Sequence, residues 1–115
     1  MSETGDELQA LFDDASGDVA VGDLPAAVEK YRRCTELDPD NFEAWHALGM
    51  ALSKTGNLKK AIGAAMMATT LQPNDQLAWT ALSQMYMSDG QIPEAEAAKQ
   101  NATVLGIGGR IDRSS

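Results

Sequence analysis

The stretch NFEAWHALGMALSKTGNLKKAIGAAMMATTLQP, residues 41–73, has the pattern of two amphipathic helices joined by a tight turn. Its apolar residues recur at helical spacing in two stripes, one on each side of Gly56. The stripes are Trp45, Leu48 and Leu52, and then Ala61, Ala65, Ala68 and Leu71. Gly56 separates them because glycine reaches the left-handed conformation needed just past a helix C-terminus. The stretch therefore predicts a helix hairpin.

Polar residues and proline mark where these helices begin and end. Asn41 and Asn57 are predicted N-caps, and Glu43 lies in a first turn, where a negative charge favours the helix dipole. Pro73 ends the second helix, because proline disfavours helical geometry at the residue before it. Asp23 is the predicted cap at the matching place in the unit before.

The hairpin recurs with a period of 34 residues. The aligned sets are Gly22, Gly56 and Gly90; Leu24, Leu58 and Ile92; Ala27, Ala61 and Ala95; Leu37, Leu71 and Leu105; Ala10, Ala44 and Ala78; Trp45 and Trp79; Leu48 and Leu82; and Pro39 and Pro73. A hairpin cannot bury both faces alone, so the units must stack. We predict an all-α chain of six helices, with one domain over residues 8–107 and repeats at about 8–41, 42–75 and 76–107. A flexible acidic N-terminus over 1–7 and a flexible tail over 108–115 are expected.

Composition narrows the class of protein. The chain has 115 residues, 43% of them hydrophobic, which suits one small domain with a core. Its single cysteine excludes a disulfide framework. No signal peptide or membrane-spanning stretch is evident. We expect a cytoplasmic protein without metal or cofactor. The acidic start and polar end resemble natural termini, so a complete small protein is expected.

The net charge of −8 is unevenly placed. Residues 1–40 carry 11 acidic and 3 basic residues, whereas residues 41–115 carry 6 of each. This distribution argues against nucleic acid as a partner, because no basic stripe is present. Two interpretations of the acidic third stay open. It is either a solvated face that aids solubility or a patch that steers a basic partner to the first repeat.

These residues resemble the tetratricopeptide repeat (TPR) family, whose consensus is W-x2-L-G-x2-Y followed by A, F, A and P. The second unit matches with Trp45, Leu48, Gly49, Leu52, Gly56, Ala61, Ala65, Ala68 and Pro73, and the third with Trp79, Leu82, Ser83, Tyr86, Gly90, Ala95 and Ala102. The resemblance implies a right-handed α-solenoid of three helix-turn-helix hairpins that binds other proteins.

Three features depart from the family pattern. Asp14 and Asp18 stand where the family has Leu and Tyr, so the first helix is expected to be the least stable. Lys99 replaces Phe in the last helix. No additional capping helix follows that helix. Its outer side is either polar enough to face water without a cap or is where another chain docks.

The resemblance also implies a binding site, because the first helices of TPR hairpins line a concave groove that holds a peptide or helix of the partner. The positions that point there are Gln9, Phe12, Ser16 and Val19; Glu43, His46, Met50 and Ser53; and Leu77, Thr80, Gln84 and Met87. The apolar members either anchor an amphipathic or extended segment or pack against the neighbouring repeat.

The chaperone-binding branch of the family grips a C-terminal carboxylate with Lys, Asn and Arg side chains. The matching residues here are Phe12, Ser16, Ala47, Leu77 and Ala81. Only Ser16 has a side chain that donates a hydrogen bond, so no binding of an EEVD-type tail is expected.

Other functions are less favoured by the sequence. Cys34 and His46 are the only residues of their types and fall on different helices, which argues against an enzyme. One alternative is a homo-oligomer or filament formed end to end through the uncapped C-terminal repeat. Another is a cytoskeletal adaptor resembling kinesin light chains, which binds a tubulin-like filament.

Overall fold

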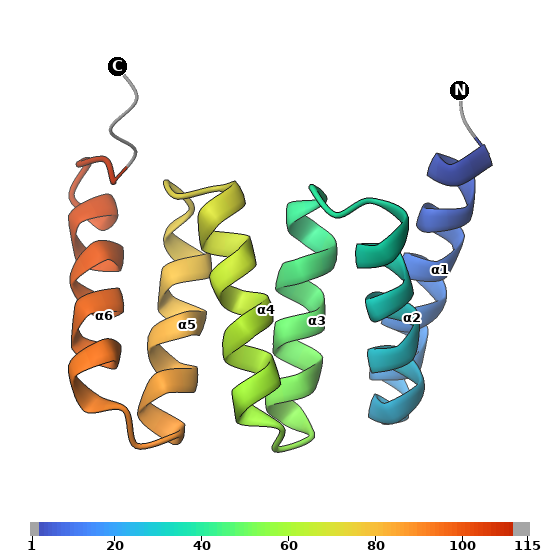
Figure 1. Ribbon diagram of the computed structural model, residues 1–115, viewed down its shortest axis with the longest axis horizontal. Coiled ribbons are helices and arrows are strands. Elements are labelled where there is room, and N and C mark those ends of the chain that lie inside the picture. The colour runs from blue at the N-terminus through green and yellow to red at the C-terminus, as the bar shows by residue number, and fades with distance from the viewer. Residues whose placement is uncertain (1–2, 112–115) are drawn as a thin grey trace.

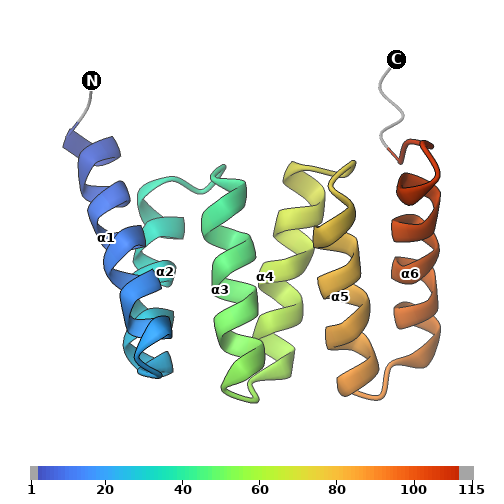
Figure 2. The ribbon, with the colours of Figure 1, turned by 180° about the vertical axis from the view of Figure 1, so that it is seen from behind.

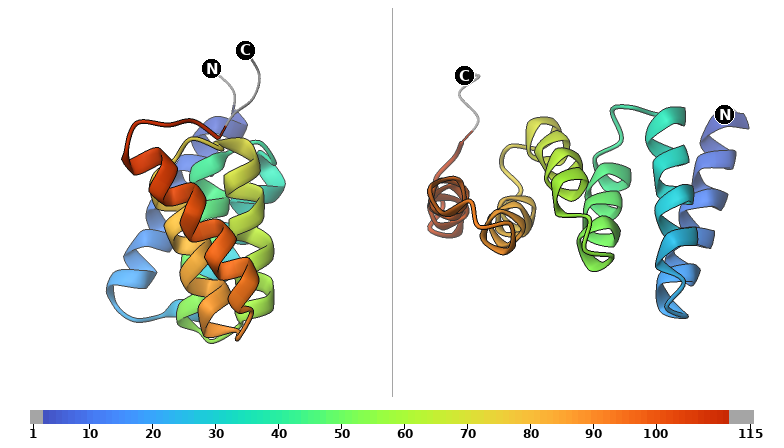
Figure 3. Two further views of the ribbon diagram at one scale, coloured as in Figure 1. Left: turned by 90° about the vertical axis from the view of Figure 1, so that its left-hand side faces the viewer. Right: turned by 60° about the horizontal axis from the view of Figure 1, so that its bottom comes forward.

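The computed structural model describes residues 3–111, and within this range the chain forms six helices and no strand. They are α1 (Glu3–Ala20), α2 (Leu24–Leu37), α3 (Phe42–Lys54), α4 (Leu58–Leu71), α5 (Gln76–Ser88) and α6 (Ile92–Gly106). Successive helices run in opposite directions, and the three hairpins stand side by side in chain order (Figure 1, and from behind in Figure 2). The right-hand view of Figure 3 shows the first hairpin side-on and the last nearly end-on, so the array twists along its length. The predicted α-solenoid of three hairpins is confirmed.

The turn inside each hairpin depends on one glycine. Gly22, Gly56 and Gly90 have φ angles of 84°, 86° and 77°, in the left-handed region that L side chains rarely adopt. The residue after each glycine donates its backbone N–H to the carbonyl five residues earlier, as in a Schellman motif. These pairs are Asp23 to Asp18 at 2.8 Å, Asn57 to Leu52 at 3.0 Å and Gln91 to Tyr86 at 2.9 Å. The predicted role of Gly56 at a helix end is therefore confirmed.

The predicted helix caps hold at two of three positions. Asn41 Oδ1 accepts a hydrogen bond from the Ala44 N–H at 2.9 Å, and Asp23 Oδ1 accepts one from the Ala26 N–H at 3.3 Å. Asn57 stands at the N-cap of α4 but makes no cap hydrogen bond, so that part of the prediction is wrong. The backbone does not explain the difference, because Asp23 and Asn57 both follow a glycine turn with nearly the same ψ, 72° and 71°, and only Asp23 caps its helix.

Small residues allow the helices of a hairpin to pack closely. Ala27, Ala61 and Ala95 are each 0% exposed. At Gly49 a Cβ atom would lie 3.3 Å from the backbone oxygen of Ala61, so α3 and α4 approach almost to backbone contact. Interiors packed this tightly lose stability when a buried group changes volume.

The two tryptophans occupy equivalent places in successive repeats. Trp45 and Trp79 are half-buried against the core, and each indole Nε1 donates to a proline carbonyl oxygen at 2.7 Å. The acceptors are Pro39 and Pro73, which lie in the turns between hairpins. Each tryptophan thereby ties the first helix of a hairpin to the turn that precedes it.

The first helix keeps the register of the repeat despite its two aspartates. Ala15, one period before the buried Gly49, is 0% exposed, so α1 is not rotated. Lys30 of α2 pairs with Asp18 at 2.7 Å and with Asp14 at 3.6 Å. The hydrogen bond with Asp18 raises the pKa of Lys30. This ion pair links α1 to α2.

Both ends of the domain differ from the expected boundaries. α1 begins at Glu3, so residues 3–7 are helical rather than part of a flexible N-terminus, and Glu7 pairs with Arg33 of α2 at 3.8 Å. After α6 the chain turns back, and the Ile111 N–H donates to Asn74 Oδ1 at 2.8 Å. Residues 1–2 and 112–115, the rest of the expected flexible segments, lie outside the described residues.

Candidate functional site

The twelve residues predicted to line a groove lie on α1, α3 and α5, which are the first helices of the three hairpins. These three helices all begin at the top edge of the array in Figure 1. None of the twelve is buried. The exposed members are Gln9, Ser16, Glu43, Met50, Leu77, Gln84 and Met87, and the half-buried ones are Phe12, Val19, His46, Ser53 and Thr80. We call the surface formed by these twelve residues the first-helix face.

The apolar members of this face fall into two groups. Phe12 packs edge-on against Tyr31, with ring centroids 5.2 Å apart, and Val19 also packs against the core. Met50, Leu77 and Met87 are instead 38%, 73% and 47% exposed. Phe12 and Val19 therefore follow the packing interpretation, while the other three present apolar surface to solvent.

Several polar members are held by neighbours on their own hairpin. Ser16 Oγ lies 3.0 Å from the Tyr31 hydroxyl, and the Thr80 hydroxyl donates to the Gln76 carbonyl oxygen at 3.0 Å. His46 stacks on Phe42 with ring centroids 5.7 Å apart. These contacts orient the side chains without burying them.

The structure brings three of the twelve residues together in one hollow. Gln9 and Phe12 of α1 and Glu43 of α3 line a space of about 80 Å³, together with Leu8 and Asn41. Leu77 and Met87 on α5 do not line this hollow. The first-helix face is thus concave between α1 and α3.

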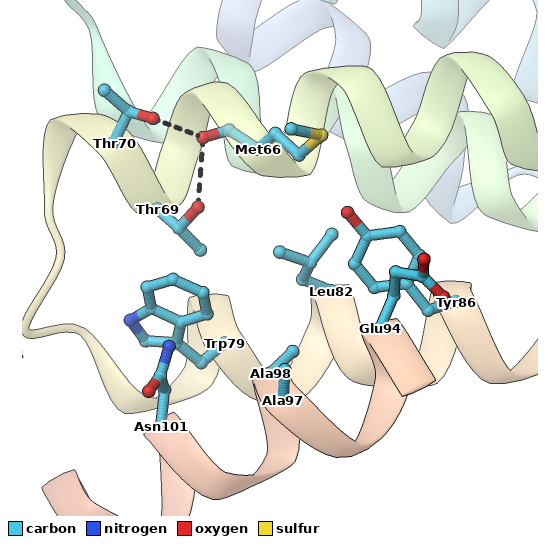
Figure 4. Close-up of a pocket in the computed structure, with 10 residues that line it drawn as sticks. All are labelled: Met66, Thr69, Thr70, Trp79, Leu82, Tyr86, Glu94, Ala97, Ala98 and Asn101. Carbon is cyan, nitrogen blue, oxygen red and sulfur yellow. Dashed lines mark hydrogen bonds between the residues drawn. The ribbon is translucent and has the colours of Figure 1, made fainter. Parts of the chain in front are cut away.

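A larger hollow lies outside the first-helix face, between α4 and α6, and α5 forms its third side (Figure 4). Its volume is about 330 Å³, and it is lined by Met66, Thr69, Thr70, Trp79, Leu82, Tyr86, Glu94, Ala97, Ala98 and Asn101. The Thr69 and Thr70 hydroxyls both donate to the Met66 carbonyl oxygen, at 3.0 and 2.9 Å. The figure shows the Met66 side chain across from Tyr86, with Trp79 at the opposite end.

The same hollow recurs one repeat earlier, between α2 and α4 and above α3. It has a volume of about 470 Å³, and Trp45, Leu48 and Leu52 form its apolar lining at positions equivalent to Trp79, Leu82 and Tyr86. Sequence reasoning missed both hollows because it assigned this stripe entirely to the core. The signal available was a small residue at equivalent positions, since Gly63 lines one hollow and Ala97 the other.

The two residues considered for catalysis lie on different helices, Cys34 on α2 and His46 on α3. Cys34 is 0% exposed, and its thiol donates to the Leu8 carbonyl oxygen at 3.6 Å. Burial raises the pKa of this thiol, so little thiolate is present at neutral pH. Among residues 3–111, no group of three or more His, Cys, Asp and Glu side chains is arranged to hold a metal ion. None of the helices described is long and apolar enough to cross a membrane.

The outer side of α6 is polar. Glu96 and Lys99 are both exposed there. One repeat earlier the same positions are Ile62 and Ala65, which are 7% and 3% exposed because the next hairpin covers them. The residues of α6 therefore suit contact with water rather than with a further repeat.

Comparison with known families assigns these hairpins. A tetratricopeptide repeat model matches residues 30–63, from the second helix of one hairpin to the second helix of the next. Over these residues the chain is similar to a tetratricopeptide repeat. Comparison with curated protein sequences gives no match.

Solved structures share the fold over nearly the whole chain. MamA AMB-1 superposes with a TM-score of 0.85 at 26% identity, over 93% of this chain and 58% of MamA. The type III secretion translocator chaperone SycD of Yersinia enterocolitica gives 0.83 at 18% identity, over 90% of this chain and 78% of SycD. The second TPR of Spaghetti (RPAP3), bound to the HSP90 peptide SRMEEVD, gives 0.81 at 20% identity, over 86% and 92%. This chain thus spans less than two thirds of MamA.

Proposed function

We propose that this protein is an adaptor, without enzymatic activity or cofactor, that binds a segment of another protein on the first-helix face. The observation that carries the proposal is the exposure of Met50, Leu77 and Met87 on α3 and α5, within a surface where none of the twelve residues is buried. Methionine is flexible and polarizable, so it suits surfaces that accept varied apolar side chains. A cytoplasmic location fits this role.

Two of the structural neighbours support a binding role, since one was solved in the CopN-Scc3 complex and another with a bound peptide. The partner segment proposed here is amphipathic or extended, with apolar side chains against α3 and α5.

Affinity capture from native lysate tests the proposal. The bait proteins are wild type, a Met50→Lys, Leu77→Lys variant of the first-helix face, and a Met66→Lys, Ile92→Lys control. Met66 and Ile92 are 49% and 47% exposed and lie outside that face, so the control adds the same charge elsewhere. We expect mass spectrometry to find one partner with wild type and control and to lose it with the first-helix variant. A partner that all three baits retain would contradict the proposal, provided that circular dichroism shows all three folded.

The proposed mode of binding uses no carboxylate clamp. At the clamp positions Ala81 is 7% exposed, Phe12 packs against Tyr31, and Leu77 offers no donor. We therefore expect no saturable binding of the peptide SRMEEVD in isothermal titration calorimetry. Binding that disappears when the peptide's C-terminus is amidated would contradict this expectation, because it would show recognition of the free carboxylate.

A further inference from the structure

The hollow between α1 and α3 combines an apolar surface with a charged edge. Leu8 and Phe12 supply the apolar part, and both are half-buried, so their inner sides are fixed by the core. Gln9, Asn41 and Glu43 supply the polar part. A volume of about 80 Å³ is too small for a folded element and leaves room for part of one side chain.

The polar atoms of the hollow are mostly committed to the fold, with one exception. Asn41 Oδ1 caps α3, and Gln9 Nε2 donates to Asp13 Oδ1 at 2.9 Å. Glu43 is exposed in the first turn of α3, and no Lys or Arg of residues 3–111 pairs with it. The helix N-terminus stabilises this carboxylate without neutralising it. Glu43 therefore remains available to a cation from outside the chain.

The negative charge around the hollow also favours a cationic occupant. The net charge of residues 1–40 equals the whole −8 of the chain, and α1 forms one wall of the hollow. At the α5 side the first-helix face is uncharged, with Leu77, Thr80, Gln84 and Met87. Glu43 is thus the only charged residue of the first-helix face, and it lies beside the acidic first repeat.

We infer that this hollow receives an arginine or lysine side chain of the protein segment bound on the first-helix face. The methylene stem lies against Phe12 and Leu8, and the cationic head pairs with the Glu43 carboxylate, as long basic side chains do when they cover apolar surface. The inference rests on the proposed function and sets the chemistry of the partner. Its segment carries a basic residue where it crosses between α1 and the start of α3, and apolar residues where it crosses Met50 of α3 and then α5.

Selection from a random twelve-residue peptide library displayed on phage tests this inference with the full chain. Wild-type protein is expected to enrich peptides that carry Arg or Lys at a fixed distance from apolar residues. Selection on Glu43→Gln is expected to keep the apolar residues and lose the basic one. Glu94→Gln is the matched control, since it removes an exposed first-turn carboxylate of α6 that lines the other hollow (Figure 4).

Affinities of a selected basic peptide give the quantitative outcome. Glu43→Gln is expected to weaken its binding by about twofold to fivefold at low ionic strength, the range of an exposed ion pair, and Glu94→Gln to leave it unchanged. Added salt is expected to reduce this difference. Selected peptides without a basic preference, or a basic peptide that binds Glu43→Gln as tightly as wild type, would overturn the inference alone. If the library yields no peptide whose binding is weakened by the Met50→Lys, Leu77→Lys substitutions, the proposed function is overturned as well.

Discussion

Two glycines inside helices show how one methyl group decides stability at the residue scale. Gly63 has no heavy atom within 4 Å of the place a Cβ would occupy, whereas at Gly49 the backbone oxygen of Ala61 is 3.3 Å away. Gly63→Ala is therefore expected to stabilise the fold by about 0.5–1 kcal/mol, because it lowers the entropy of the unfolded chain. Gly49→Ala lowers the entropy of the unfolded chain by the same amount, but its added methyl group must separate α3 from α4.

We expect that separation to win, so that Gly49→Ala lowers the free energy of unfolding by about 1 kcal/mol. Urea denaturation followed by circular dichroism measures both variants. Equal stabilisation by the two substitutions would show that the close approach of α3 and α4 is not a constraint.

Cys34 reports on opening of the first hairpin. Its side chain is fully buried, and burial raises the pKa of the thiol, so iodoacetamide at neutral pH should modify it only when α1 separates from α2. We expect slow labelling of the native protein and rapid labelling in denaturant, measured by mass spectrometry. Labelling of native protein at the rate of free cysteine would instead indicate that the first hairpin is open.

At the scale of the helical element, the caps separate what sequence can predict from what it cannot. The prediction placed an asparagine cap at both Asn41 and Asn57, and only the first forms the hydrogen bond. Asn41→Ala is expected to cost about 1 kcal/mol of stability and Asn57→Ala a few tenths at most. Thermal denaturation of the two variants checks this, and equal losses would mean that Asn57 also caps its helix.

The difference between local signals and long-range contacts explains how much of the fold was predictable. Periodicity, the glycine turns and the alanines at helix crossings are local or repeated signals, so hairpins, turns and core followed from the sequence. The start of α1 at Glu3 did not, because its ion pair between Glu7 and Arg33 joins residues far apart in the chain. The hollows between second helices also depend on how hairpins are spaced, which no single residue encodes.

The helices that carry the twelve candidate residues were predictable from the sequence, but which of those residues stay exposed was less so. The twelve positions given by the family pattern all lie on α1, α3 and α5, and none is buried. The pattern could not separate Phe12, which Tyr31 holds, from Met50 and Leu77, which remain exposed. That distinction depends on contacts between helices.

At the scale of the whole molecule, the outer side of α6 bears on self-association. Glu96 and Lys99 replace the buried Ile62 and Ala65 of the preceding repeat. Stacking another hairpin there would remove both charges from water, which is costly unless they are paired. We expect light scattering to give a constant monomer mass across a concentration series, and Glu96→Ile, Lys99→Ala to associate. A wild-type mass that rises with concentration would instead support assembly through this end.

The central claim is that a partner segment lies on the first-helix face rather than in the hollows between second helices. The most direct measurement is the change in amide chemical shifts when the partner segment identified by affinity capture is added to 15N-labelled protein. The account predicts changes concentrated at Glu43, Met50, Leu77 and Met87. Changes concentrated at Met66, Tyr86 and Asn101, with the first-helix face unaffected, would contradict it and place the binding site between α4 and α6.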